Sequence, residues 1–389
     1  SNFKFFTLIF LEKVIKMKKI KILQFPLSSS FGGVTHYVLN VWKELDKQKF
    51  SFDFLTFSKE LFFEKDLIKD GSKVFHFTCY PQENLEVFKK EFIDILKNNY
   101  DIIELHTSYW KNTIMEEIIR NACDSKIIVH AHATGIAPKP IDLCEYEKCL
   151  KQHVIIRDTL KSDLIDEKLA CSEEAAKWLF GTEKNVKIIN NFITINNFKF
   201  NREDRQKKRE ILKMKDAFVI GMVGRYELEK NHAFLIEIAS KLKCYITDFK
   251  ILMIGDGSQK DNIKKEIYSR GLQEFFILID AVDDTSDWYS AMDIFVLPSI
   301  KEAFGLVLLE AQSNGLPCLC STEIPSIVIN KKYSKRISLC DMDEWIETIL
   351  FYYKNKNSYK ARNVLIDYKK FDSSYIIKSI KKIYEEISL

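Results

Sequence analysis

Short apolar runs alternate along the chain with longer segments in which apolar residues recur at helical spacing. Apolar runs bounded by polar turn residues are typical of buried strands, and the intervening segments are typical of crossover helices. The alternation indicates an α/β protein with parallel sheets. In the first half it predicts a helix over 34–46 and strands over Ile20 to Phe25, Phe52 to Phe57, Lys73 to Phe77, Ile102 to Leu105, Ile127 to His130, Lys168 to Ala170 and Val186 to Ile189.

The alternation begins again after a strongly charged segment, residues 199–216, which we interpret as the natural domain boundary. Two such halves in tandem predict two Rossmann-like domains facing each other. The last segment, Ser373 to Leu389, has isoleucines at helical spacing and predicts an amphipathic helix. The second half predicts strands over Phe218 to Val223, Phe249 to Ile254, Phe276 to Leu278 and 294–297, and helices over 231–243, 258–270, 285–291 and 305–314.

The chain of 389 residues is long enough for two separate cores. We expect an N-terminal extension over 1–16, an N-terminal Rossmann-like domain over 17–198 and a C-terminal one over 199–372. The helix over 373–389 is expected to pack back on the N-terminal domain.

Composition excludes several classes of protein. The net charge of +4 is too small to indicate nucleic-acid binding. No apolar segment reaches the 18 residues or so that span a bilayer. The nine cysteines match neither a disulfide framework nor a zinc pattern, so we expect reduced thiols in a cytoplasmic protein.

The N-terminal extension leaves two interpretations open. It is a segment preceding a natural start at Met17, or a helix that lies in a membrane interface, since the apolar run Phe5 to Leu11 precedes a basic stretch. Peripheral binding to the inner membrane surface is therefore a further expectation. The basic residues are Lys13, Lys16, Lys18, Lys19 and Lys21.

Two carboxylates in residues 299–315 are the first candidate site residues. Glu302 precedes a Phe-Gly step, and Glu310 lies within an apolar run, where a carboxylate is costly to bury unless a polar group meets it. We expect Gly305 to separate a loop from a helix, with Glu302 beside the helix N-terminus and Glu310 about a turn and a half inside. Both then face a ligand over the carboxyl end of the preceding strand, where open α/β sheets bind nucleotides.

Basic residues and glycines follow two other predicted strands. Gly224 and Arg225 end the strand at Val223, and Lys230 opens the next helix. Cationic donors near a helix N-terminus suit a diphosphate. Gly255 and Gly257 follow the strand ending at Ile254 and predict a tight turn that lets another group approach the backbone closely.

The order of these pieces resembles the nucleotide-binding half of retaining glycosyltransferases of the GT-B fold, family 4 (glycosyl transferases group 1). The resemblance covers most of residues 218–330. Upstream, three segments look like bacterial capsule and exopolysaccharide transferases: Phe31 to Asn40, Ile128 to Ala133 and Ala170 to Gly181. The resemblance implies transfer of a sugar from a nucleotide-diphosphate sugar, of the UDP or GDP type, to a saccharide acceptor, expected to be lipid-linked, in surface polysaccharide synthesis.

The resemblance also implies roles for single residues. Arg225 and Lys230 would hold the donor diphosphate, Glu310 would accept hydrogen bonds from the ribose, and Glu302 would contact the donor sugar. Backbone N–H groups around Phe304, Gly305 and Leu306 would reach the sugar or phosphate. Gly32 and Gly33 would let backbone N–H groups approach the phosphates from the opposite domain.

Histidines of the first half are the remaining catalytic candidates. We expect His130 and His132 to point to opposite sides of a strand end, so that only one faces the cleft. The resemblance implies a cleft histidine here, and we favour His132 over His130. His106 is a further candidate for the cleft. A metal site made with Cys144 and Cys149 matches no known ligand spacing.

No metal and no cofactor besides the donor substrate is expected. Asp283 with Asp284, and Asp341 with Asp343, resemble carboxylate pairs for a metal-bound diphosphate, but Arg225 and Lys230 already supply positive charge. Two alternatives stay open: a nucleotide-sugar epimerase or hydrolase on the same fold, and a catalytically silent nucleotide-sugar-binding protein. A nicotinamide dehydrogenase is disfavoured, because neither half carries Gly-x-Gly-x-x-Gly after its first strand.

Overall fold

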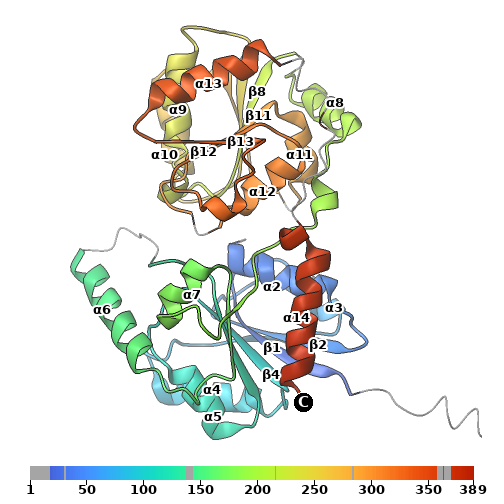
Figure 1. Cartoon of the computed structure of the whole chain (residues 1–389), viewed down its shortest axis with the longest axis vertical. Helices are drawn as coiled ribbons and strands as arrows, with labels where there is room; N and C mark the ends of the chain where they lie inside the picture. The colour runs from blue at the N-terminus through green and yellow to red at the C-terminus, as the bar shows by residue number, and fades with distance from the viewer. Residues whose placement is uncertain are drawn as a thin grey trace, which may run out of the picture. The chain divides into compact units, whose positions relative to one another are not determined.

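The computed structural model describes residues 18–29, 32–136, 143–214, 216–282, 284–302, 304–356, 362 and 369–389. The chain divides into two compact units, each built on its own parallel sheet (Figure 1). The first unit extends to Asn191 and includes Ser374–Leu389, and the second comprises Phe192–Ser373. Residues 192–198, which the sequence analysis assigned to the first domain, therefore belong to the second unit.

The first unit contains a seven-stranded sheet in the order β3-β2-β1-β4-β5-β6-β7. Every strand pair is parallel. The strand order reverses direction between β1 and β4, which makes this position the topological switch point of the sheet. The strands are β1 (Ile20–Leu27), β2 (Phe50–Thr56), β3 (Val74–His76), β4 (Ile102–Thr107), β5 (Lys126–Ala131), β6 (Glu167–Ala170) and β7 (Lys187–Ile188).

Helices cover both faces of this sheet. Leu23 and Ile103 pack in one apolar cluster with Phe88 of α4 and Ile119 of α5. Neighbouring strand positions point to the opposite face, which α2 and α14 cover. The helices are α2 (Gly33–Glu44), α3 (Glu64–Lys69), α4 (Leu85–Leu96), α5 (Ile114–Ala122), α6 (Leu143–Thr159), α7 (Glu173–Phe180) and α14 (Ser373–Ile387).

The second unit contains a six-stranded parallel sheet in the order β10-β9-β8-β11-β12-β13, with its switch point between β8 and β11. The strands are β8 (Phe218–Val223), β9 (Phe249–Ile254), β10 (Phe276–Ile279), β11 (Ile294–Leu297), β12 (Cys318–Ser321) and β13 (Ser334–Ile337). The α-helices are α8 (Arg202–Ile211), α9 (Ala233–Leu242), α10 (Lys260–Ser269), α11 (Ser286–Ala291), α12 (Leu306–Ser313) and α13 (Met342–Lys354).

The charged segment 199–216 contains α8, which belongs to the second unit and does not form a linker. Arg205 and Arg209 reach Asp293 at 2.6 and 2.5 Å, and the same carboxylate accepts a hydrogen bond from Val219 N at 2.8 Å. Burial acts to raise the pKa of Asp293, but Arg209 and Arg205 more than offset it, and the pKa is lowered. The polarity that suggested a boundary therefore serves in part to fasten α8 to the sheet.

No helix in the described part of the chain is long and apolar enough to cross a membrane. Residues 1–16, with the predicted extension or interfacial helix, lie outside the described residues. All nine cysteines lie within the described ranges and none of them is in a disulfide; three are buried.

The ion pairs of α8 generate a stability prediction. Asp293→Ala leaves the buried ends of Arg205 and Arg209 without their carboxylate, so we expect it to lower the free energy of unfolding by about 3–5 kcal/mol. Asp287→Ala is the matched control. Asp287 also pairs with a residue of α8, Lys208, at 2.8 Å, but its side chain is 38% exposed. It should cost less than about 1 kcal/mol. Urea unfolding of both variants tests this, and equal losses would contradict it.

Candidate active site

Two loops at the switch point of the second sheet carry the charged residues that the sequence singled out. Gly224 and Arg225 follow β8, while Glu302 lies in the loop between β11 and α12. Because β8 and β11 are neighbours and parallel, both loops leave the same edge of the sheet.

Glycines hold the loop after β8 against the turn after β9. A Cβ on Gly255 would lie 2.0 Å from the carbonyl oxygen of Gly224, and one on Gly257 would lie 2.7 Å from that of Tyr226. Tyr226 N also donates to the carbonyl of Asp256 at 2.9 Å. The sequence predicted that another group approaches Gly255 and Gly257 closely. That group is the backbone on either side of Arg225, so a larger residue at either glycine would displace this loop.

Lys230 and Glu302, 72 residues apart in sequence, form an ion pair. Their side chains are 16% and 12% exposed. Arg225 is more open: its side chain is 47% exposed, and its contact with Glu229 is 3.6 Å long. Arg225 therefore keeps donors free for an anion, and Lys230 has two further N–H donors beyond the one that meets Glu302.

Hydrogen bonds fix the two loops to each other. Asn231, in the left-handed conformation at φ 58°, donates from Nδ2 to the carbonyl of Pro298 at 3.1 Å. Ile300 N donates to the carbonyl of Glu229 at 2.8 Å. Ser299 Oγ lies 3.4 Å from Glu302 Oε2. The Lys230–Glu302 pair is consequently held by backbone as well as by charge.

Glu310 is buried in α12, as its position in an apolar run predicted, and polar groups meet it there. Tyr289 donates its hydroxyl to Glu310 Oε2 at 2.5 Å, and Thr285 Oγ1 lies 3.4 Å from the same oxygen. Burial raises the pKa of Glu310 to about 7, although the hydrogen bonds from Tyr289 and Thr285 act to lower it. Sequence reasoning missed Tyr289 and Thr285, for which the only signal was the need of a buried carboxylate for a donor.

The residues before α12 have unlike surroundings. Gly305 adopts the left-handed conformation at φ 94° and is the N-cap of the helix, where no side chain caps the backbone. Phe304 is 3% exposed and packs edge-on against Phe371. Phe304 can therefore contact a ligand only through its backbone, and the same is true of Gly305. Leu306 is the first helical residue.

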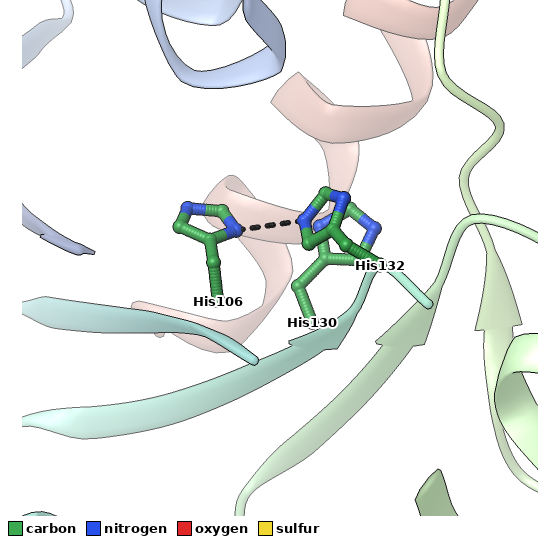
Figure 2. A group of neighbouring side chains, drawn as sticks. All are labelled: His106, His130 and His132. Carbon is green, nitrogen blue, oxygen red and sulfur yellow. Dashed lines mark hydrogen bonds between the residues drawn. The ribbon is translucent and has the colours of Figure 1, made fainter. Parts of the chain in front are cut away.

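The first unit holds a cluster of three buried histidines, His106, His130 and His132 (Figure 2). The expectation that His130 and His132 point to opposite sides is wrong: their ring centroids are 4.1 Å apart. Residues two apart along an extended chain share a face, and β5 ends at Ala131. His106 on β4 is the register partner of His130 and joins them, with its Nδ1 3.0 Å from His132 Nε2.

A second layer of polar groups, which sequence reasoning missed, supports these histidines. Glu104 Oε1 lies 3.2 Å from His130 Nδ1, and Gln24 Oε1 lies 2.5 Å from His106 Nε2. Gln24 Nε2 donates to Glu104 Oε2 at 3.0 Å, and Tyr384 of α14 donates its hydroxyl to the same carboxylate. The sequence signal that could have identified this layer was the presence of polar residues, Gln24 and Glu104, inside apolar strands.

Burial keeps all three imidazoles neutral at pH 7. It lowers the pKa of His130 to about 3, with a smaller opposing effect of the Ile189 carbonyl. It also holds the pKa of His106 and His132 well below the usual value, against smaller opposing effects of Glu104 and Asn191 respectively. Groups of this kind accept hydrogen bonds or bind metals through a free lone pair.

Other predicted residues have simpler surroundings. Gly32 and Gly33 begin α2, and a Cβ on either would meet nothing within 4 Å. Asp284 accepts from Ser286 N at 2.8 Å, and Asp341 accepts from Glu344 N at 3.0 Å as the N-cap of α13. Asp283, Phe31 and Ala303 lie outside the described residues.

Comparisons with known proteins agree with this architecture. Residues 203–370 match the family model for glycosyl transferases group 1. The chain is 27% identical over 339 residues to the putative glycosyltransferase EpsF of Bacillus subtilis, covering 82% of this chain and 84% of that protein. It is also 27% identical over 344 residues to the UDP-Gal:alpha-D-GlcNAc-diphosphoundecaprenol alpha-1,3-galactosyltransferase of Escherichia coli, covering 85% and 87%.

Among solved structures, Anabaena HepE in complex with UDP and glucose matches with a TM-score of 0.75 at 17% identity, covering 94% of this chain and 99% of that one. The predicted fold of two Rossmann-like domains is confirmed by this match and by the two parallel sheets. Residues 203–370 thus match the glycosyl transferases group 1, and with its two Rossmann-like sheets the chain is a glycosyltransferase of the GT-B fold.

Proposed function

We propose that this glycosyltransferase moves a sugar, with retention of its anomeric configuration, from a UDP-sugar to a hydroxyl of a lipid-linked saccharide in bacterial surface polysaccharide synthesis. The observation that carries the proposal is the placement of Arg225 and Lys230 after β8, and of Glu302 and Glu310 after β11, at the switch point of one sheet. The E. coli relative, whose name specifies UDP-Gal and a diphosphoundecaprenol acceptor, supports the donor and acceptor class.

The donor diphosphate is assigned to Arg225 and Lys230. A diphosphate at the switch point replaces the long contact of Arg225 with Glu229 by shorter, charge-assisted hydrogen bonds. Charge grows on this group as the sugar leaves, so its stabilisation is the largest catalytic effect expected of the site.

The ribose is assigned to Glu310. When ionised, its carboxylate accepts hydrogen bonds from both ribose hydroxyls, while Tyr289 continues to hold one oxygen. The elevated pKa means that donor binding shifts Glu310 from a mixture of protonated and ionised forms to the ionised form.

Glu302 is assigned to the donor sugar, with His132, and His130 beside it, near the sugar and acceptor. In the transfer, the bond from the anomeric carbon to the phosphate oxygen breaks and a bond to the acceptor oxygen forms on the same face. The acceptor hydroxyl gives its proton to the departing phosphate oxygen. No enzymic nucleophile is needed, and the inner membrane surface, where a lipid-linked acceptor is found, is the proposed place of reaction.

A transfer assay tests the function. We expect UDP-sugars, presented with a sugar-diphospho-polyprenol acceptor, to give a product one sugar longer with the donor's anomeric configuration, read by mass spectrometry and NMR. Arg225→Ala should lower kcat about a hundredfold or more, because losing one transition-state donor costs about 2.7–4 kcal/mol.

Arg202→Ala, an exposed arginine at the start of α8, is the control and should leave turnover unchanged. Turnover of Arg225→Ala near that of the control at saturating donor would remove the assigned role. Isomerised or hydrolysed donor without any elongated acceptor would favour the epimerase or hydrolase alternative.

Glu310 generates a pH prediction. Below pH 7 the free enzyme carries a proton on Glu310 that ribose binding must displace, so donor affinity should fall as pH falls through about 7. Calorimetry at pH 7 in buffers of different ionisation enthalpy should detect proton release on donor binding. Glu310→Gln should abolish the release and weaken binding.

Glu116→Gln is the matched control, because burial also raises the pKa of Glu116 to about 7, although this residue lies in α5 of the first unit. It should leave proton release unchanged. If release persists in Glu310→Gln and disappears in Glu116→Gln, Glu310 does not meet the ribose.

Two cationic side chains at the diphosphate position generate a metal prediction. Turnover in excess EDTA should stay within a few-fold of turnover with Mg²⁺, because Arg225 and Lys230 supply the charge that a divalent ion would otherwise provide. Initial rates over a chelator titration measure this. Complete loss that Mg²⁺ or Mn²⁺ restores would show that a cation holds the diphosphate instead.

A further inference from the structure

We propose that Tyr226 and His232 are positioning residues of the donor site, whose stacked rings hold the loop that carries Arg225 and Lys230. The proposal rests on the proposed function, because it takes a diphosphate as the ligand of these two cations. Both rings belong to buried residues, with exposed fractions of 0% and 2%. They therefore act through the loop that they hold and not by touching the ligand.

The two rings join the beginning of this loop to its end. Tyr226 directly follows Arg225, and His232 lies two residues after Lys230 as the N-cap of α9. Their ring centroids are 4.1 Å apart and the ring planes differ by 13°, so the rings are stacked. Lys230 lies between the two joined points, and Arg225 lies immediately outside them.

Tyr226 is the fixed half of the pair. Its backbone N–H donates to the Asp256 carbonyl at 2.9 Å, and its own carbonyl accepts from Gln259 N at 2.8 Å. Its ring belongs to the same apolar cluster as Phe234 of α9. The backbone and the ring of Tyr226 are thus both anchored, and His232 holds the far end of the loop against this anchor.

His232 contributes by its position and not by charge. Burial lowers the pKa of His232 to about 4, although a contact with the Gly224 carbonyl acts to raise it. The imidazole is therefore neutral at pH 7 and adds no charge beside Lys230. A Cβ on Gly224 would lie 3.9 Å from two carbons of the Lys230 side chain. The residue before Arg225 is consequently in contact with both His232 and the stem of Lys230.

Arg225 depends on its backbone for its position. Its side chain is 47% exposed, and its contact with Glu229 is 3.6 Å long. The reach of the guanidinium is therefore set by the residues on either side, Gly224 and Tyr226. A displacement of about 1 Å at a catalytic group can lower the rate about 100-fold. Loss of the stacked pair should accordingly affect the rate as well as the stability of the fold.

Variants of His232 separate positioning from stability. We expect His232→Ala, assayed well below its melting temperature, to lower kcat about 10- to 100-fold while the KM for the acceptor stays unchanged. His232→Phe keeps an aromatic ring against Tyr226 and should recover most of the loss. Amide hydrogen exchange over residues 226–232 should be faster in His232→Ala than in the unmodified chain, because the loop is no longer closed.

Phe275→Ala is the matched control. Phe275 and Phe249 are both buried in the same unit, and their rings are stacked with centroids 4.6 Å apart and an interplanar angle of 13°. Phe249 begins β9, so this pair lies at the opposite edge of the sheet from the candidate site. Phe275→Ala loses a comparable stack and should be less stable, while kcat and the exchange of residues 226–232 stay as in the unmodified chain.

Ligand binding separates this proposal from the proposed function. Calorimetry should show that His232→Ala weakens binding of UDP more than binding of uridine, because the loop meets the diphosphate. If the unmodified chain binds UDP and transfers sugar, but folded His232→Ala keeps its kcat and its loop exchange, this proposal alone is overturned. Equal losses of kcat in His232→Ala and Phe275→Ala also overturn it. An unmodified chain that neither binds UDP nor transfers sugar overturns the proposed function, and this proposal with it.

Discussion

A carboxylate that is buried inside an apolar helix or strand needs a hydrogen-bond donor. Each unit of this protein contains such a carboxylate and its donor. In the first unit Glu104 lies within the central strand β4, and in the second Glu310 lies within the apolar helix α12. Each receives a tyrosine hydroxyl, from Tyr384 and from Tyr289. Tyrosine suits this role because its ring packs in the core while its hydroxyl reaches the charge. Each hydrogen bond offsets part of the free-energy cost of burying the carboxylate.

The two units handle charge in different ways. Around the loops after β8 and β11, acidic and basic side chains are partly exposed and meet in ion pairs such as Lys230 with Glu302. At the carboxyl ends of β4 and β5, burial instead keeps three imidazoles neutral. The first arrangement suits a strongly charged ligand, because the protein supplies fixed charge that is already oriented. The second suits groups recognised through lone pairs and hydrogen bonds.

The sequence predicted local features well and pairings between distant residues poorly. Strands β8 and β9 have the predicted bounds, because each is a continuous apolar run. Strand β12 was not predicted, since Cys318–Ser321 is short and carries no clear period. Arg225, Lys230, Glu302 and Glu310 could be selected because each breaks a local pattern. Their partners could not, because a contact such as that of Tyr384 with Glu104, 280 residues apart, leaves no trace in spacing. The wrong prediction for His130 and His132 had a different origin. Residues two apart along an extended chain lie on the same face, whereas the prediction placed these two on opposite faces.

The C-terminal helix has a consequence for how the chain is made. Tyr384 completes the hydrogen bonding of Glu104 and also reaches Gln24, yet it is translated after the whole second unit. During synthesis the strands of the first unit are therefore available before Glu104 has received the hydrogen bond from Tyr384. The first unit becomes complete only after the whole second unit has been translated, so the order of assembly in the cell differs from the order of the sequence. A mutation or truncation that disturbs α14 therefore acts on Gln24 and Glu104, which lie about 280 residues or more earlier in the sequence.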